Sequence, residues 1–379
     1  MIKVCHIITK LELGGAQRNT LFTVANLNHD KYNAFLISGS GGILDGEAEK
    51  DLKLYSVKSL IRRISPLNDF KAFISIYRII KLEKPDIVHT HSSKAGILGR
   101  IAAKLAGVKV IIHTIHGFGF NNTQSMPVKY LYIYLEKICA WFTDKLIAVA
   151  KEDVVKGLNN AIGKSVQYTV IRSGIDTQYY KNYKPDPEFR KTLGLTQSMK
   201  AVLSIGPFKP QKNFKDFIMA AEIVCKERDD VLFFIAGDGG MRKELEDLIA
   251  GLGLQKKTVL LGWRKDIAEL LYASDIFVLT SLWEGLPRSG VEAMCCAKPV
   301  IANAVDGVKE LVVDGKNGYK TAPYDYKNTA EKITLLLEDD NARISMGKAA
   351  KESIGKEFDI NYMVIQQEEL YEQLITNYE

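Results

Sequence analysis

The sequence predicts an α/β protein of two domains, each a parallel sheet covered by helices. The chain has 379 residues, more than a single hydrophobic core usually organises. Short apolar runs alternate with amphipathic stretches in both halves, which is typical of parallel strands joined by helices. A polar, proline-containing stretch at residues 177–197 separates the two halves.

In the first half, the expected strands are short apolar runs rich in β-branched residues, at 2–8, 34–37, 86–89, 110–114, 146–149 and 168–171. The segments between them carry apolar residues at three- and four-residue intervals, which is the spacing of a helix with one buried face. These helices are expected at 17–27, 69–83, 95–106 and 129–142.

The second half follows the same plan. Its strands are expected at 201–205, 231–236, 258–261, 276–279 and 299–302, and its helices at 214–226, 241–252, 267–273 and 289–297. A further helical zone covers 329–338 and the polar tail to residue 379. Parallel sheets of this kind bind ligands at the carboxyl ends of their strands, and a cleft between two such domains can enclose a nucleotide and a second substrate.

The composition indicates a globular protein without a membrane-spanning segment. It is 46% hydrophobic and 25% charged, and no apolar run approaches the roughly 18–20 residues that cross a bilayer. The first ten residues are interpreted as a strand rather than a secretory signal. The five cysteines form no CxxC pair, which favours reduced thiols in the cytoplasm.

The charge is distributed unevenly between the two halves. Residues 1–175 hold 24 Lys and Arg against 13 Asp and Glu, a net +11, whereas residues 176–379 hold 27 against 32, a net −5. A basic half suggests an anionic partner such as a membrane surface, a lipid diphosphate or nucleic acid. No nucleic-acid-binding motif accompanies the basic residues, so nucleic acid is not expected. An unevenly charged, solvated surface remains the plain alternative.

The glycine pattern argues against a dinucleotide cofactor. Gly14 and Gly15 are not followed by a third glycine at the spacing of GxGxxG, and neither are Gly237 and Gly239. Two glycine-containing turns before helices can still hold a phosphate through backbone N–H groups, one at residues 13–16 and one at 284–290.

The second of these turns carries two carboxylates. Glu284 lies in the turn, and Glu292 lies eight residues later, in the expected helix. Carboxylates suit vicinal hydroxyl pairs, so one could bind a sugar and the other a ribose. Two solvated surface glutamates are the alternative, which the apolar flanks at 277–279 and 291–294 make less favourable.

These residues carry a family resemblance. The run from Glu284 to Gly318, EGLPRSGVEAMCCAKPVIANAVDGVKELVVDGKNG, resembles the E-x7-E motif and following segment of glycosyltransferase family 4, which has the GT-B fold. Further matches are GPFKPQKN from Gly206, AGDGG at 236–240, LGW at 261–263 and HG at 116–117. The segment HTHSSKAGILGR at 89–100 resembles members that build capsular and other surface polysaccharides.

The resemblance implies two Rossmann-like domains that face each other across a deep cleft. Residues 1–175 would form an acceptor domain, with a C-terminal helix at about 360–379 packing back on it, and residues 176–359 a donor domain. The implied activity is retaining, metal-independent transfer of a sugar from a nucleoside diphosphate sugar, with UDP-sugar preferred, to a hydroxyl of a lipid-linked or surface-polysaccharide precursor.

The resemblance also assigns roles to single residues. Glu284 would contact hydroxyls of the transferred sugar, and His116 would lie by that sugar and the bond being made; these two are the expected catalytic residues. Lys212 would neutralise the diphosphate, and Glu292 would hold the ribose. The full set expected at the donor is Gly14, Gly15, Gly206, Lys212, Asp238, Arg264, Gly285, Leu286, Pro287, Arg288, Ser289 and Glu292.

One position departs from the family pattern. The family usually has arginine directly after the glycine that matches Gly206, and this chain has Pro207 there, which carries neither charge nor N–H. Arg288, beside Ser289 in the second glycine turn, is the candidate replacement.

No metal or cofactor is expected. The leaving diphosphate needs preorganised positive potential, but the chain contains no Asp-x-Asp pair for Mg²⁺ or Mn²⁺. Lys212 and two helix N-termini are the expected substitutes. His89 and His91 share one side of a strand end, but with no Cys, Asp or Glu at ligand spacing, hydrogen-bonded histidines are favoured over a metal site. Front-face attack is favoured over a double displacement through Glu284.

The acceptor and its membrane are expected to meet the basic first half. Residues 58–63 and 70–84 combine apolar side chains with Lys71, Arg78, Lys81 and Lys84, and a basic amphipathic face can rest on anionic lipid. The expected location is therefore cytoplasmic and peripheral on the inner face of the cell membrane, with a polyprenyl-diphosphate-linked or polysaccharide acceptor. The alternatives are a GT-B-fold epimerase or hydrolase, and a non-catalytic nucleotide-sugar-binding protein.

Overall fold

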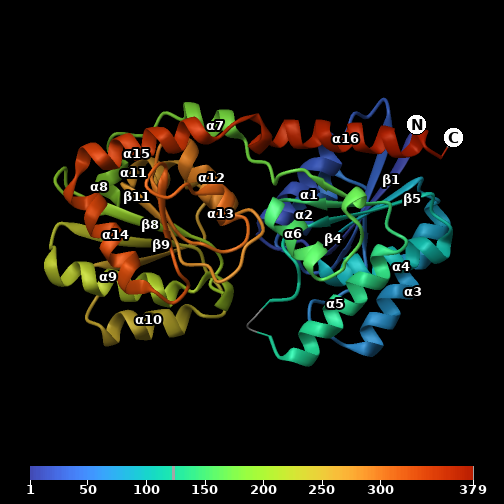
Figure 1. Cartoon of the computed structure of the whole chain (residues 1–379), viewed down its shortest axis with the longest axis horizontal. Helices are drawn as coiled ribbons and strands as arrows, with labels where there is room; N and C mark the ends of the chain where they lie inside the picture. The colour runs from blue at the N-terminus through green and yellow to red at the C-terminus, as the bar shows by residue number, and fades with distance from the viewer. Residues whose placement is uncertain (122–123, 379) are drawn as a thin grey trace. The chain divides into compact units, whose positions relative to one another are not determined.

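The computed structural model describes residues 1–121 and 124–378, and the chain divides into two compact units. The first comprises Met1–Gly174 together with Ile360–Glu379, and the second comprises Ile175–Asp359. Figure 1 shows the helices and strands of both units.

The first unit is built on a seven-stranded parallel sheet in the order β3-β2-β1-β4-β5-β6-β7. The strand order reverses between β1 and β4, which is the point where doubly wound sheets bind their ligands. The strands are β1 (Ile2–Lys10), β2 (Tyr32–Gly39), β3 (Leu54–Ser56), β4 (Ile87–His91), β5 (Val110–Ile115), β6 (Lys145–Ala148) and β7 (Tyr168–Val170).

Helices cover both faces of this sheet, so its strands are buried on both sides and form nearly continuous apolar runs. On β1, Val4 packs in the core beneath α16, whereas Cys5 faces the core beneath α3 and α4. The helices of the unit are α1 (Gly15–Asn26), α2 (Asp45–Asp51), α3 (Pro66–Glu83), α4 (Ser93–Ala106), α5 (Met126–Ala140), α6 (Lys151–Asn159) and α16 (Ile360–Thr376).

The C-terminal helix α16 is part of this first unit, although more than 180 residues of the second unit precede it. Met363, Val364 and Tyr371 bury their side chains in the same core as Val4. The Tyr32 hydroxyl donates a 3.1 Å hydrogen bond to the Glu368 carbonyl, which fixes the helix against the start of β2. In Figure 1, the red helix α16 lies beside the blue and cyan elements of this unit.

The second unit has a six-stranded parallel sheet in the order β10-β9-β8-β11-β12-β13, again with a reversal, between β8 and β11. Its strands are β8 (Lys200–Ile205), β9 (Val231–Ala236), β10 (Thr258–Gly262), β11 (Ile276–Leu279), β12 (Val300–Asn303) and β13 (Gly318–Thr321). Its helices are α7 (Thr177–Asn182), α8 (Phe189–Thr192), α9 (Phe214–Glu227), α10 (Arg242–Gly251), α11 (Ile267–Ala273), α12 (Arg288–Cys295), α13 (Val308–Leu311), α14 (Tyr326–Glu338) and α15 (Asp340–Ser353).

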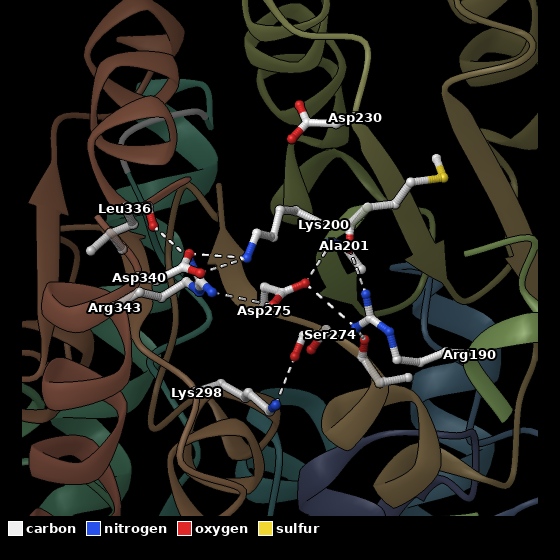
Figure 2. A network of polar contacts seen from close by, with 12 residues as sticks. Arg190, Lys200, Ala201, Asp230, Ser274, Asp275, Lys298, Leu336, Asp340 and Arg343 are labelled. Carbon is white, nitrogen blue, oxygen red and sulfur yellow. Dashed lines mark hydrogen bonds and ion pairs between the residues drawn. The ribbon is translucent and has the colours of Figure 1, made fainter. Parts of the chain in front are cut away.

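A network of ion pairs closes the amino edge of this second sheet (Figure 2). The Asp275 carboxylate accepts the Ala201 N–H at 2.8 Å and lies 3.5 Å from Arg190 and 3.7 Å from Arg343. Lys298 donates to the Ser274 carbonyl at 2.7 Å. Because the strands are parallel, these contacts leave the carboxyl edge, at the opposite end of the strands, for a ligand.

The fold confirms the expected class, and most expected elements are found within a few residues of their expected ends. The strands β3 and β13 were not expected, because their sequences, LYS and GYKT, contain no run of apolar β-branched residues. The apolar residues of the 70–84 segment divide between two environments. Ile76 and Ile80 are buried against the sheet, whereas Phe70 is exposed.

Candidate active site

The carboxyl edge of the second sheet brings Lys212 and Glu284 together at the strand-order reversal. Lys212 ends a short 3-10 turn after β8, and Glu284 lies in the turn after β11. The Lys212 ammonium donates to Glu284 Oε1, and the Ser281 hydroxyl donates to the same oxygen at 2.7 Å. The two charged side chains are only 12% and 8% exposed. A cation and a carboxylate thus meet in a largely dry site, where both interact strongly with a charged ligand.

Asp306 holds the backbone of Glu284 from the other side. The Glu284 N–H donates to Asp306 Oδ2 at 2.9 Å, and Asp306 itself has φ +35°. A positive φ is uncommon for a residue with a side chain and often marks a functional loop. Asp306 is not among the residues expected from the sequence; the Asp-Gly pair that begins three residues after the end of β12 was the available signal.

Further hydrogen bonds fix the 280–284 loop between its neighbours. Leu282 N–H donates to the Gln211 carbonyl at 2.8 Å, and the Gln211 side chain donates to the Trp283 carbonyl at 2.8 Å. From β12, the Asn303 amide donates to the Thr280 carbonyl at 2.9 Å. Residues of β12 and of the 3-10 turn after β8 therefore hold the 280–284 loop in place.

The helix α12 follows this turn and carries Glu292. Arg288 lies one helical turn before it, with 3.8 Å between Arg288 Nη2 and Glu292 Oε1. Gly290 permits close packing here, since a Cβ at this position would lie 3.1 Å from Leu311 and 3.2 Å from Leu279. The preceding residues Gly285, Leu286 and Pro287 are buried, and Ser289 is partly exposed.

The loops after β8, β9 and β10 are joined backbone to backbone. Phe208 N–H donates to the Asp238 carbonyl at 2.9 Å, and Gly237 N–H donates to the Gly262 carbonyl at 2.8 Å. Gly237 has φ +151°, and a Cβ there would lie 1.9 Å from the Gly206 carbonyl oxygen. Only glycine allows the two loops to come this close.

Two residues that are expected to contact the sugar donor, Asp238 and Arg264, each form an ion pair with a neighbour in these loops. The Asp238 carboxylate accepts from Arg242 at 2.9 Å, and Arg264 binds Asp266 through two nitrogens, one of them at 2.8 Å. Asp238 and Arg264 are thereby held by neighbours in their own segments, and their expected contacts with a donor stay predictions.

In the first unit, the expected glycine turn begins α1 at the reversal of the first sheet. Gly14 is the N-cap and Gly15 the first helical residue, and the first turn contains no acidic residue. The adjacent strand end, after β4, holds Ser92 at φ +61°, with its hydroxyl 2.7 Å from that of Thr9. A helix N-terminus whose first turn carries no acidic residue suits an anion.

His116 follows β5 and joins a group of buried histidines in the first unit. His91 Nδ1 lies 3.3 Å from His116 Nε2, and His6 Nδ1 lies 3.0 Å from His91 Nε2. Burial lowers the pKa of His116 to about 4 and that of His6 to about 3. Both rings are therefore neutral at physiological pH.

A small cavity lies beside these rings, within the first unit. Its polar lining includes His91, His116, Thr114, Asn19, Arg172 and Gln367. One ring nitrogen from each of His6, His89 and His91 also lies within 4.8 Å of the others. The sequence interpretation considered only His89 and His91 for a metal; His6 joins them because β1 pairs with β4 in a register that sets His6 opposite His89.

The family models that match this chain, and two of its relatives, are all glycosyltransferases. Residues 185–353 match the model for glycosyl transferases group 1, and residues 13–179 match the model for Glycosyltransferase Family 4. The chain is 34% identical over 380 residues to the UDP-Gal:alpha-D-GlcNAc-diphosphoundecaprenol alpha-1,3-galactosyltransferase of Escherichia coli, which covers 99% of this chain and 98% of that protein.

A second relative is the N,N'-diacetylbacillosaminyl-diphospho-undecaprenol alpha-1,3-N-acetylgalactosaminyltransferase of Campylobacter jejuni, at 28% identity over 83% of this chain and 84% of that protein. Among solved structures, Anabaena HepE in complex with UDP-glucose superposes with a TM-score of 0.85 at 23% identity, over 98% of this chain and 100% of that chain. Among the described residues, no helix is both long and apolar enough to cross a bilayer.

Proposed function

The chain belongs to glycosyltransferase family 4 and is a glycosyltransferase of GT-B fold, and we propose that it transfers a hexose from a UDP-sugar, with retention and without a metal ion, to a polyprenyl-diphosphate-linked sugar. The observation that carries the proposal is the Lys212–Glu284 pair at the strand-order reversal of the second sheet. The names of two relatives, which specify undecaprenol-diphosphate acceptors, support the acceptor class.

The pair suggests how a donor binds. In the ligand-free protein, the Lys212 ammonium is neutralised by Glu284. A diphosphate competes for the ammonium with a greater charge, so Lys212 moves to the phosphate and Glu284 is left to accept hydrogen bonds from sugar hydroxyls. Binding of the nucleotide thus readies the carboxylate for the sugar, and Glu292 on α12 accepts from the ribose.

Metal independence rests on the positive groups available to the leaving diphosphate. Lys212 supplies a fixed charge, and the N-terminus of α12 supplies backbone dipoles beside Arg288. We expect an equal transfer rate in the presence of EDTA and of Mg²⁺.

Retention is proposed to follow from front-face attack by the acceptor hydroxyl, whose proton passes to the leaving phosphate oxygen. Glu284 Oε1 accepts from the Ser281 hydroxyl, and Asp306 holds the Glu284 backbone, and neither contact involves Lys212. These contacts suit a fixed hydrogen-bond acceptor better than a nucleophile, which must approach the anomeric carbon.

The first unit is proposed to meet the lipid-linked acceptor at an anionic membrane surface on the cytoplasmic side. Leu67 and Phe70, in the first turns of α3, are 79% and 65% exposed. Arg62, Arg63 and Lys71 are exposed close by in the sequence. Exposed apolar side chains flanked by cations are the combination that binds anionic lipid.

The test is a transfer assay with purified protein, a panel of UDP-, GDP- and dTDP-sugars, and polyprenyl-diphosphate-linked N-acetylglucosamine. Thermal stabilisation identifies the donor, because a ligand that binds the folded state raises its stability. We expect one UDP-hexose to stabilise the protein and to give an α-linked product. An inverted product, dependence on Mg²⁺, or turnover of the donor alone to an epimer would each contradict the proposal.

His116→Ala provides the second arm of the test. Loss of transfer with retained donor stabilisation is the expected result, at about 100-fold or more in kcat. Near-normal transfer by a folded His116→Ala protein would remove His116 from the reaction.

A further inference from the structure

A continuous chain of polar groups runs through the interior of the first unit and ends at His116. It begins at the Tyr371 hydroxyl on α16, which lies 3.4 Å from His6 Nε2. His6 Nδ1 then meets His91 Nε2 at 3.0 Å, and His91 Nδ1 meets His116 Nε2 at 3.3 Å. The chain therefore links the C-terminal helix to the residue after β5.

Register places these rings together. His6 on β1 is paired with His89 on β4, and His91 is two residues further along the same strand, on the same face. That face is the one covered by α16. His6, His89 and His91 are 3% exposed or less, and the Tyr371 side chain is fully buried.

Burial keeps the imidazoles neutral. It lowers the pKa of His91 and of His89 well below the ordinary value, as it does for His6 and His116. A neutral imidazole has one N–H and one bare nitrogen. Each ring in the chain must therefore donate in one direction and accept from the other, so the tautomers of all three rings are coupled.

Tyr371 sets the direction. Its oxygen lies 2.6 Å from His89 Nδ1, much closer than its contacts with His6 at 3.4 Å and Gln367 at 3.5 Å. A phenol O–H is a stronger donor than a neutral imidazole N–H, so the Tyr371 hydroxyl donates its hydrogen bond to His89 Nδ1. His89 in turn directs its Nε2–H to the Thr114 hydroxyl, 2.6 Å away.

The direction of the Tyr371–His89 hydrogen bond determines the tautomers of His6, His91 and His116. Because the Tyr371 O–H is donated to His89, the Tyr371 oxygen accepts from His6 Nε2–H. His6 Nδ1 is then bare and accepts from His91 Nε2–H, and His91 Nδ1 accepts from His116 Nε2–H.

We infer that the Tyr371–His6–His91 chain fixes His116 as the Nε2–H tautomer, so that its Nδ1 presents a lone pair to a hydroxyl of the substrate. Tyr371, His6 and His91 are positioning residues, and His116 is the group they position. The inference deepens the proposed function and rests on it for the identity of the substrate.

The same rings raise the alternative of a metal ion. A zinc ligand must offer a bare ring nitrogen to the ion. One nitrogen from each of His6, His89 and His91 lies within 4.8 Å of the others, but Tyr371 and Thr114 bond both nitrogens of His89. Hydrogen bonding thus accounts for the ring positions without an ion.

The experiment is NMR of protein labelled with ¹⁵N at histidine, which reports the tautomer of each ring without any turnover. Wild type is expected to show His116 with Nδ1 bare and Nε2 protonated, as one tautomer. Tyr371→Phe removes the acceptor at the end of the chain and is expected to give mixed tautomers at His6, His91 and His116. Its kcat is expected to fall about tenfold, with unchanged KM for the donor.

Tyr32→Phe is the matched control. It removes a hydroxyl that donates to the Glu368 carbonyl of the same helix, from a ring that packs edge-on against Tyr371. It tests α16 packing without touching the chain, and we expect unchanged tautomers and kcat. His91→Leu should lower kcat by more than Tyr371→Phe does. His91→Gln should recover part of that kcat, because its amide can both donate and accept a hydrogen bond.

Three results would overturn the inference. One is a wild-type His116 with Nδ1 protonated; another is a Tyr371→Phe protein whose tautomers and kcat match those of Tyr32→Phe. The third is stoichiometric Zn²⁺ or Co²⁺ binding that His6→Ala abolishes. If the wild type transfers no sugar but shows the fixed tautomers, the proposed function fails while the chain stands.

Discussion

Lys212 and Glu284 are 72 residues apart in the sequence and form an ion pair in the second unit, at a site where each side chain is almost fully buried. The pair lies where the strand order reverses, so the fold itself selects this edge for a ligand. A buried pair is costly to break by removing one partner, because the other charge is left without compensation. The pair is thus both a structural contact and the proposed switch for donor binding.

The first prediction separates these two roles of Lys212. Lys212→Met should lower the free energy of unfolding by about 3 kcal/mol, because Glu284 stays buried without its cation. It should also abolish thermal stabilisation by the donor. The double variant Lys212→Met/Glu284→Gln should recover stability but not donor binding.

Lys215→Met is its control, since Lys215 pairs with Glu244 at a site where both side chains are about half exposed. We expect little change in stability or donor binding, as is usual for surface pairs. Normal donor stabilisation of the Lys212→Met protein would show that the ammonium does not bind the diphosphate.

The second prediction concerns Asp306. Asp306→Ala removes the acceptor for the Glu284 N–H and should lower kcat by about tenfold, because a loosely held carboxylate contacts the sugar less well. Asp306→Asn keeps an oxygen acceptor and tolerates positive φ, so it should remain close to wild type. Asp314→Ala is a matched control, since Asp314 accepts the Lys320 N–H at 2.7 Å in another loop. Equal activity of the two alanine variants would count against a role for Asp306.

Both sheets and the turn that carries Glu284 can be predicted from the sequence. The residues that could not be predicted share one physical cause. The alternation of apolar runs predicts both sheets, and the spacing of Glu284 and Glu292 points to the turn before α12. Asp306 could not be predicted, because its contact with Glu284 depends on the pairing of β11 with β12. No local sequence pattern encodes that pairing.

The same holds for the histidine chain. His6, His91, His116 and Tyr371 come from four separate segments, and strand order with one helix docked on the sheet brings them together. The sequence showed His89 and His91 on one side of a strand, but Tyr371 lies 282 residues after His89. Long-range register, rather than residue type, was the missing information.

The third prediction addresses the absent family arginine at Pro207. If Arg288 replaces it, Arg288→Ala should weaken donor binding about tenfold, the loss expected for one charge-assisted contact to phosphate. Arg228→Ala provides the comparison, because Arg228 pairs with Asp230 just before β9, at the amino edge. Donor affinity and turnover equal to wild type in Arg288→Ala would refute the replacement.

The fourth prediction concerns membrane binding by the first unit. The wild-type protein should sediment with vesicles that contain anionic lipid at low salt. The sedimenting fraction should fall as added salt screens the charges. Leu67→Ser/Phe70→Ser should bind several-fold more weakly, since two exposed apolar side chains are lost. Leu82→Ser, at the other end of α3 and 75% exposed, should bind as wild type. Failure of the wild type to bind at low salt would contradict a membrane-bound acceptor.

The last prediction tests the stability of the first unit against pH, through Glu83. The Lys3 ammonium at 2.6 Å, with Lys53 at 2.9 Å and the Tyr55 hydroxyl, lowers the pKa of the Glu83 carboxyl to about 2. The folded pKa is thus below the ordinary value of 4.5. Ionised Glu83 therefore stabilises the fold above about pH 4.5, and this stabilisation is lost as pH falls toward 2.

Glu83→Gln should accordingly lower the free energy of unfolding at pH 7 by about 2 kcal/mol. Urea unfolding at several pH values should show the difference from wild type shrinking between pH 4.5 and pH 2.5. Glu372→Gln, which breaks a surface pair with Lys31, should have a much smaller effect at pH 7. A Glu83→Gln deficit that stays constant or grows on acidification would mean that Glu83 contributes through packing rather than through its charge.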